Sequence, residues 1–240
     1  MKLPFTHKKN NIDSNEQDIR FVYKCDDITD INEIVVGSIF HVTISKDISD
    51  VVVAVDKKYK DSLVSTFSIQ DHKTYKTAIL AVTLSGNVVS TGKELARVIL
   101  PESKLNIDRL ELGGTADMHG GHFNAIACAV VTSGASELMA TIKSKRVLIN
   151  TSGSSTVFAD GEVETLAIDA SGSSEVYVNG LNTKTAIVTV SGASTVQTQP
   201  TDNITVRASG ASTVEYGRYV KHEDVKTTGA SQTTRTTGPK

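Results

Sequence analysis

Ser152-Gly153-Ser154-Ser155-Thr156-Val157 is the stretch that decides the fold, because close copies of its first four residues recur along the second half of the chain. The copies occupy residues 133–136, 152–155, 171–174, 191–194, 209–212 and 228–231. Their central glycines, from Gly134 to Gly229, are separated by 19, 19, 20, 18 and 19 residues. A near-constant period of this length is typical of stacked repeats.

Apolar and polar residues alternate around each copy. Small or β-branched residues stand two, four and six places before the glycine, as at Leu166, Ile168 and Ala170. Others stand four and six places after it, as at Val157 and Ala159. A period of two predicts strands that bury one face. Each repeat is therefore predicted to hold a strand, a Ser-Gly-(Ala/Ser)-Ser corner, a second strand and a polar connection.

Two arrangements fit this alternation: antiparallel hairpins in a barrel, and parallel coils in a β-solenoid. The parallel one is favoured because the phrase returns once per period with its neighbours in the same order. Parallel coils lie ~4.8 Å apart, so equivalent residues fall above one another, and such crossovers are almost always right-handed. We predict an all-β fold, a right-handed parallel β-helix or solenoid with coils of about 19 residues. Its turns should place these glycines in one column: Gly114, Gly134, Gly153, Gly172, Gly192 and Gly210.

Four segments are expected along the chain. Residues 1–19 are polar and predict a disordered arm. Residues 20–104 hold less regular strands, with one short helix at 57–64; they form either a separate sheet or an irregular start of the same stack. Residues 105–216 are predicted to form the regular solenoid. Residues 217–240 are expected to form an atypical cap that frays into a polar, Thr-rich tail, since terminal repeats of solenoids are often atypical.

The composition excludes several classes of protein. Among 240 residues, 25 Lys and Arg against 27 Asp and Glu give a net charge of −2, so no basic field for nucleic acid is expected. No run approaches the ~20 apolar residues of a membrane-spanning helix, and the chain as given has no signal peptide. Cys25 and Cys128 are too few for a disulfide framework, and Cys128 falls on the buried phase.

Several segments together resemble a known family. They are residues 37–44 and 51–56, the passage from Val98 to Pro101 and on to Leu112-Gly113-Gly114-Thr115-Ala116-Asp117-Met118, and the Ser-Gly-Ser-Ser-(Thr/Glu)-Val repeats. Over roughly residues 30–216 the chain is similar to the family "Putative auto-transporter adhesin, head GIN domain". The resemblance implies an all-β, parallel-coil fold, an adhesin role and an exported or envelope-anchored location. It brings no catalytic residues. Members of the family usually begin with a signal or lipoprotein sequence.

Three sets of polar residues could carry chemistry, and each has a simpler explanation. The repeated serines have no histidine beside them, whereas a nucleophile needs a base within hydrogen-bond reach. Asp117, His119 and His122 match no four-ligand metal pattern, so a solvated loop is expected there. Glu137 and Glu175 share a phase but lie two coils apart, ~9.6 Å by stacking, on an open face unlike the cleft of a glycosidase. We therefore expect no catalytic, cofactor-binding or metal-binding residues.

One row of large apolar residues is predicted to point outward. Met139, Phe158 and Tyr177 stand five places after their glycines, and Gln197 and Glu215 continue the row. Such a row often marks a contact surface. Either the N-terminal half covers it, or it contacts a protein or glycan ligand or a second copy. The sequence thus favours a non-enzymatic binding or adhesion module. The alternatives are a self-assembling structural scaffold and, less favoured, a glycan-active β-helix enzyme.

Overall fold

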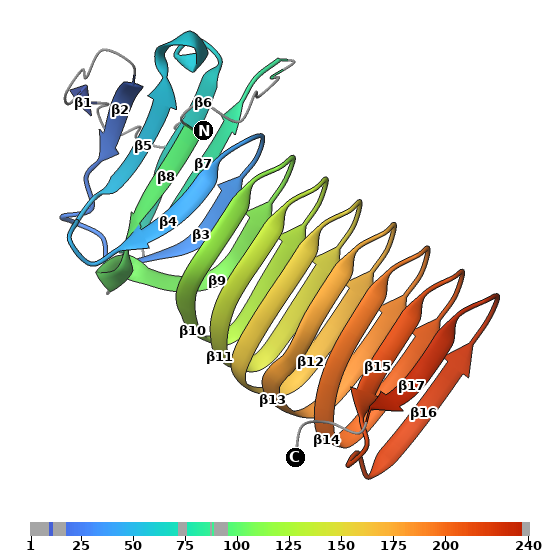
Figure 1. Ribbon diagram of the computed structural model, residues 1–240. Helices are drawn as coiled ribbons and strands as arrows, with labels where there is room; N and C mark the ends of the chain where they lie inside the picture. Colours follow the sequence, from blue (N-terminus) through green and yellow to red (C-terminus); the bar gives the residue numbers. More distant parts are fainter. Residues whose placement is uncertain (1–9, 12–17, 72–75, 87, 89–95, 237–240) are drawn as a thin grey trace.

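The computed structural model describes residues 10–11, 18–71, 76–86, 88 and 96–236. The described strands join in one 17-stranded sheet that winds into a stack of coils, with the N-terminal strands at one end and β16 and β17 at the other (Figure 1). The strands are β1 (Asn10–Asn11), β2 (Asp18–Tyr23), β3 (Asp30–Val36), β4 (His41–Ser45), β5 (Val51–Asp56), β6 (Leu63–Asp71), β7 (Lys76–Leu84), β8 (Ala96–Pro101), β9 (Leu105–Leu112), β10 (Asp117–Thr132), β11 (Glu137–Thr151), β12 (Thr156–Ala170), β13 (Glu175–Val190), β14 (Thr195–Ala208), β15 (Thr213–Gly217), β16 (His222–Thr227) and β17 (Gln232–Thr236).

The predicted parallel solenoid is confirmed in the regular coils. Strands β10 to β14 pair in parallel with equivalent residues side by side, so that Val157 pairs with Leu138 on one side and Val176 on the other. The glycine column is also confirmed. All six predicted glycines have φ between 71° and 78°. The carbonyl of each accepts a hydrogen bond from the coil above, as from Ser154 N to Gly134 O at 2.7 Å.

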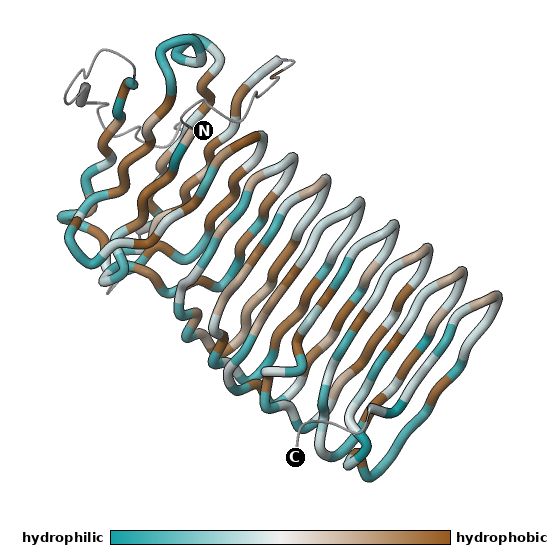
Figure 2. Tube along the Cα trace, viewed as in Figure 1, coloured by the Kyte–Doolittle hydropathy of each residue, from teal (hydrophilic) through white to brown (hydrophobic). Residues whose placement is uncertain are grey.

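The core lies inside the coils, on the predicted phase. Hydrophobic and hydrophilic residues alternate along the strands (Figure 2). Val157, Ile168, Val176 and Val188 are at most 1% exposed, whereas Asp160, Asp169 and Lys184 are exposed. The narrow interior is therefore filled by β-branched and small side chains, one layer per coil, as the alternation predicts.

The N-terminal part is the less regular start of the same stack, not a separate sheet. β3 pairs in parallel with both β7 and β9, and β4 does so with both β8 and β10. The coil made of β3 and β4 thus lies next to the coil made of β9 and β10, although residues 46–104 separate them in sequence. β2 and β6 add antiparallel pairings to β5 and β7.

The glycine column extends into this early coil, where Ser38 takes the place of glycine. Ser38 has φ 66°, and its carbonyl accepts a hydrogen bond from Thr115 N at 2.7 Å. A Cβ added to Gly114 would lie 2.6 Å from Ser38 O. In the later coils, a Cβ added to a corner glycine would lie similarly close to the carbonyl oxygen of the glycine in the preceding coil. The corner is the same, although its sequence lacks the Ser-Gly-(Ala/Ser)-Ser phrase.

Two expectations for the N-terminal part need correction. The predicted helix at 57–64 is reduced to a 3-10 turn, η1 (Lys57–Tyr59), because Leu63 and Phe67 bury one face of β6 against the core. A second 3-10 turn, η2 (Glu102–Lys104), precedes β9. Within the predicted disordered arm, Asn10–Asn11 pairs with β2, and β2 itself begins at Asp18. Residues 1–9 and 12–17 of the arm lie outside the described residues.

The predicted fraying after Tyr216 does not occur before Thr236. β16 and β17 pair in parallel with β14 and β15 and complete a further coil. The inward phase of this coil carries charge, but Arg235 Nη2 lies 2.5 Å from Glu223 Oε1, and Tyr216 Oη donates to Glu223 Oε2 at 2.9 Å. The charges of Glu223 and Arg235 therefore form an ion pair at the end of the core. Residues 237–240 of the predicted tail lie outside the described part of the chain.

Candidate functional site

Met139, Phe158 and Tyr177 form an outward row in register on β11, β12 and β13, and we call this row the apolar strip. Met139 and Phe158 are 42% and 38% exposed, and Tyr177 is half-buried. The strip is therefore open to solvent, and the described part of the N-terminal half does not cover it. Gln197 and Glu215 continue the row on β14 and β15.

The two rings of the strip stack on each other. The ring centroids of Phe158 and Tyr177 are 5.0 Å apart and the ring planes differ by 14°. Since the rings stack from coil to coil, their edges rather than their faces are turned to solvent. Tyr177 Oη donates a hydrogen bond to Glu175 Oε2 at 3.0 Å, and desolvation, with Glu175 as a smaller cause, raises the pKa of Tyr177.

A groove of about 570 Å³ runs beside the apolar strip. The strip forms one side, and the next outward row, with Thr141, Asp160 and Gly180, forms the other. Between the two rows lie Ala140 and Ala159, which are 8% and 6% exposed. The groove is hollow because the residues between its rows are small.

Two irregular coils bound this groove. On β10 the four residues from His119 to His122 stand opposite three on β11, with Gly120 and Gly121 at the irregularity. On β13 the four residues from Tyr177 to Gly180 stand opposite three on β12. Between them β11 and β12 pair without a shift. The groove thus lies over the two 19-residue coils. Each flanking coil has 20 residues, and its extra residue forms a bulge at one end of the groove. Bulges re-aim side chains and are frequent next to binding sites.

The coil lengths in the sequence carry a signal for the groove. The glycine spacings of 20 residues, from Gly114 to Gly134 and from Gly172 to Gly192, mark the two bulged coils. The apolar strip alone was predicted. The second row of the groove could not be located without the position of the extra residue within each coil.

The outward rows around the groove are acidic. Glu137 and Glu175 lie in one row with Thr156 between them, as predicted from their shared phase. Asp160 lines the groove itself. This arrangement is an open wall with no enclosed pair of carboxylates, so it does not resemble the two-carboxylate site of a glycosidase.

Asp117, His119 and His122 lie on β10, and the solvated loop expected there is a bulged strand instead. His119 Nε2 is 3.6 Å from Asp117 Oδ2 and 3.8 Å from Glu137 Oε1, and His41 Nδ1 also contacts Asp117. His122, beyond the bulge, is exposed and pairs in register with Thr141. Within the described residues, no group of three or more His, Cys, Asp or Glu side chains has the geometry to hold a metal ion.

The repeated serines form a buried ladder behind the corners. Ser155, Ser174, Ser194 and Ser212 are fully buried. Each donates a hydrogen bond to the carbonyl three residues earlier, as from Ser174 Oγ to Ser171 O at 3.0 Å. Thr151 Oγ1 lies 2.9 Å from Ser174 Oγ, which joins two coils. These hydroxyls are committed to holding the turns and are closed to a substrate.

The two thiols are structural as well. Cys25 and Cys128 are free and buried. Burial raises the pKa of Cys25 to about 11 and that of Cys128 to about 12. Since the thiolate is the nucleophilic form, neither thiol is activated for chemistry.

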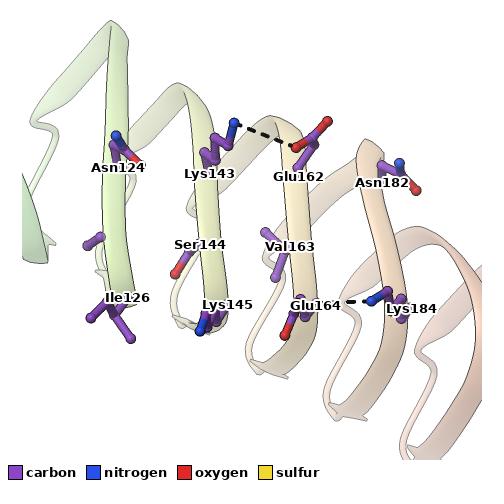
Figure 3. Close-up of a pocket in the computed structure, with 11 residues that line it drawn as sticks. Asn124, Ile126, Lys143, Ser144, Lys145, Glu162, Val163, Glu164, Asn182 and Lys184 are labelled. Atoms are coloured by element: carbon purple, nitrogen blue, oxygen red, sulfur yellow. Dashed lines mark ion pairs between the residues drawn. The ribbon is translucent and has the colours of Figure 1, made fainter.

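A second hollow, of about 580 Å³, lies at the bend of coils β10 to β13 that follows the groove (Figure 3). Ile126 is 73% exposed at its edge. Lys143 pairs with Glu162 across neighbouring coils, and Lys184 pairs with Glu164, each at 3.9 Å. Lys145 lines the hollow as well. The charges of the hollow are therefore mixed, and both of its glutamates pair with lysines, unlike the acidic residues around the groove.

Solved structures with the same fold come from Bacteroides and Parabacteroides species. A putative adhesin from Bacteroides fragilis NCTC 9343 has a TM-score of 0.69 at 15% identity, covering 92% of this chain and 98% of its own. A putative adhesin from Parabacteroides merdae ATCC 43184 has a TM-score of 0.61 at 17% identity, covering 92% and 97%. A putative lipid binding protein from Parabacteroides distasonis ATCC 8503 has a TM-score of 0.59 at 16% identity, covering 95% and 100%. At these identities the likeness shows the fold alone.

A comparison with curated protein sequences gave no match. None of the helices in the described part of the chain has the length and apolar character needed to cross a bilayer. The sequence profile of the family "Putative auto-transporter adhesin, head GIN domain" matches residues 75–218. The match begins later than the resemblance over roughly 30–216 expected from the sequence, and it spans β7 to β15, including the whole apolar strip. The chain therefore belongs to the family "Putative auto-transporter adhesin, head GIN domain".

Proposed function

We propose that this protein is a non-enzymatic binding module of the adhesion type, and that the apolar strip of Met139, Phe158 and Tyr177 is its contact surface. The observation that carries the proposal is one row of three large side chains beside a groove, of which Met139 and Phe158 are exposed and Tyr177 is half-buried. Exposed apolar patches on otherwise polar surfaces are a mark of contact sites. The family description, an auto-transporter adhesin head, supports a binding role and an exported or cell-surface location.

The solenoid suits this role because it holds the strip rigidly. The strands that carry the strip are held in place by backbone pairing with neighbouring strands. A rigid surface loses little conformational entropy on contact, so more of the interaction energy appears as affinity. Aromatic rings supply large contact area, and Tyr177 keeps a polar group at its tip.

The last coil favours a binding module over the alternative of an end-to-end scaffold. Its inward phase carries the ion pair of Glu223 and Arg235. Inward-pointing charges are a common device that blocks pairing between exposed sheet edges. A scaffold that grows by stacking coil on coil would have to bury this pair, which is costly.

The described residues also favour binding over catalysis. The repeated serines are buried and bonded to turn carbonyls, and the carboxylates near the groove stand on an open wall. Without a nucleophile next to a base, or an enclosed carboxylate pair, the wall lacks the parts that a hydrolase needs.

The test uses the double variant Phe158→Ser with Tyr177→Ser and a matched control, Leu148→Ser with Ile187→Ser. The control removes two exposed apolar side chains, 37% and 46% exposed, from a different row. Binding is measured on glycan and peptide arrays, and self-association by sedimentation velocity. We expect both double variants to stay folded with a modest loss of melting temperature, and only the strip variant to lose association. Association that survives in the strip variant would contradict the proposal, as would an unmodified protein that binds nothing and stays monomeric.

A further inference from the structure

We infer that the groove beside the apolar strip takes a short segment of a protein partner in which an apolar or aromatic side chain is flanked by lysine or arginine. The inference rests on the proposed function, because it names the chemistry of the partner that the same strip would contact. Three features of the groove lead to it: the sign of the surrounding charge, the orientation of the rings and the length of the hollow.

The charge around the groove has one sign. In register from β10 to β15, the row on one flank of the strip reads Asp117, Glu137, Thr156, Glu175, Thr195 and Thr213. The row of the strip ends in Glu215, and Asp160 lines the far side of the groove. These rows contain two histidines, His119 and His122, but no lysine or arginine. A cationic segment is the complementary partner, and an acidic one would be repelled.

The orientation of the rings selects an apolar or aromatic anchor rather than a sugar. Phe158 and Tyr177 cover one face of each other at 5.0 Å, and their outer faces look along the stack toward Met139 and Gln197. A sugar ring stacks flat on an open aromatic face, which this surface does not turn outward. The exposed ring edges carry the positive part of the ring quadrupole and prefer the face of another aromatic ring or an aliphatic group.

The length of the hollow limits the segment. The groove extends over coils β10 to β13 and ends at the bulges of β10 and β13. Three coil spacings of ~4.8 Å give roughly 14 Å, the span of about four residues of extended chain. One or two side chains of the segment can therefore lie in the groove, while flanking cations reach Glu137, Asp160 and Glu175 at its rim.

The hollow at the bend provides a natural contrast on the same coils. Glu162 and Glu164 are exposed there but already pair with Lys143 and Lys184. Near the groove, Glu175 accepts a hydrogen bond from the phenol of Tyr177, and Glu137 lies 3.8 Å from His119. Among the described residues, neither glutamate pairs with lysine or arginine. Neutralising two carboxylates at either place changes the net charge of the protein equally. A difference in peptide binding between the two double variants would therefore come from the position of the carboxylates and not from the net charge.

The experiment compares two labelled synthetic peptides by fluorescence polarisation. Both carry the same Leu-Phe-Leu centre; one is flanked by lysines and the other by glutamates. We expect the lysine-flanked peptide to bind roughly ten-fold more tightly, as two or three exposed ion pairs allow, and to weaken as salt is added. Glu137→Gln with Glu175→Gln should remove this preference. Glu162→Gln with Glu164→Gln should keep it, and Phe158→Ser with Tyr177→Ser should abolish binding of both peptides.

The outcomes separate this inference from the proposed function. Equal binding of both peptides, lost in the Phe158 and Tyr177 double variant, would overturn the charge preference and leave the strip as the contact surface. A glycan that binds through the strip would also overturn the inferred partner and leave the strip as the contact surface. Failure of the lysine-flanked peptide to bind overturns the inference, as does an equal loss of preference in the Glu162 and Glu164 variant. If the lysine-flanked peptide still binds more tightly than the glutamate-flanked peptide after both rings are removed, the inference and the proposed function are both wrong.

Discussion

The rings of Phe158 and Tyr177 lie one above the other on neighbouring coils, with their centroids 5.0 Å apart and their planes 14° from parallel. Parallel stacking in register is what places them there, because β12 and β13 pair Phe158 directly with Tyr177. An aromatic pair of this kind gains energy beyond the area it buries. The stacked pair thus adds to the stability of the solenoid, apart from the contact role that we propose for the strip.

This pairing predicts a measurable coupling energy. In a double-mutant cycle with Phe158→Leu and Tyr177→Leu, we expect a coupling of about 0.5–1 kcal/mol, near the lower part of the range for aromatic pairs because the rings are partly solvated. The free energies come from urea unfolding of the four proteins. A coupling indistinguishable from zero would mean that the two rings do not hold each other in solution.

Burial alternates so sharply along β12 that neighbouring residues should respond oppositely to truncation. Ile168 is 1% exposed, and Asp169 is exposed on the outer wall. Ile168→Ala should lower the free energy of unfolding by about 2–5 kcal/mol through the cavity that it leaves. Asp169→Ala should change it by less than about 0.5 kcal/mol. Chemical denaturation of the two variants measures the difference, and equal losses would place the strand in the opposite phase.

The regular coils could be predicted from the sequence because their signals are local and repeated. A period of two decides which side chains point inward, and the repeated Ser-Gly phrase marks the corner of every coil. Val157, Ile168 and the glycine column follow directly from these two patterns. The apolar strip also follows, since its members share a phase.

Other parts depend on contacts that no local pattern shows. The coil of β3 and β4 lies next to β9 and β10 only because a long insertion returns to the stack, and its corner at Ser38 lacks the repeated phrase. The last coil was expected to fray because Glu223 stands on the inward phase, but its partner Arg235 lies twelve residues away. The groove depends on where each 20-residue coil places its extra residue, which spacing alone does not reveal.

The glycine column predicts a strong position effect for one substitution. Gly153 has φ 74°, and a Cβ there would lie 2.5 Å from Gly134 O of the coil below. Gly120 has φ 90° but open space around it, so Gly120→Ala is the matched control. Gly120→Ala should cost about 1–2 kcal/mol for the left-handed backbone alone. Gly153→Ala should cost about 1–3 kcal/mol more, because two coils have to move apart. Equal losses in thermal or urea unfolding would show that the contact between coils is relaxed in solution.

The last coil should loosen in acid. Hydrogen bonds from Arg235 and then Tyr216 hold the pKa of Glu223 below its usual range, and a hydrogen bond from Arg207 lowers the pKa of Asp224 in the same strand. A carboxylate whose pKa is depressed by folding contributes its stabilisation above the ordinary carboxylate pKa. That contribution is lost as the pH falls through the lower pKa of the folded state. β16 and β17 should therefore lose stability in acid before the coils beneath them do.

Hydrogen exchange of the backbone amides measures this, with protection factors corrected for the intrinsic effect of pH. Protection of β16 and β17 should fall between neutral and acidic pH, while that of β12 stays high. The double variant Glu223→Gln with Asp224→Asn keeps side chains of similar shape but removes both charges. It should show low protection of the last coil already at neutral pH and little further change in acid. If β16 and β17 of the unmodified protein are equally protected from exchange at both pH values, the ion pair with Arg235 does not stabilise the last coil.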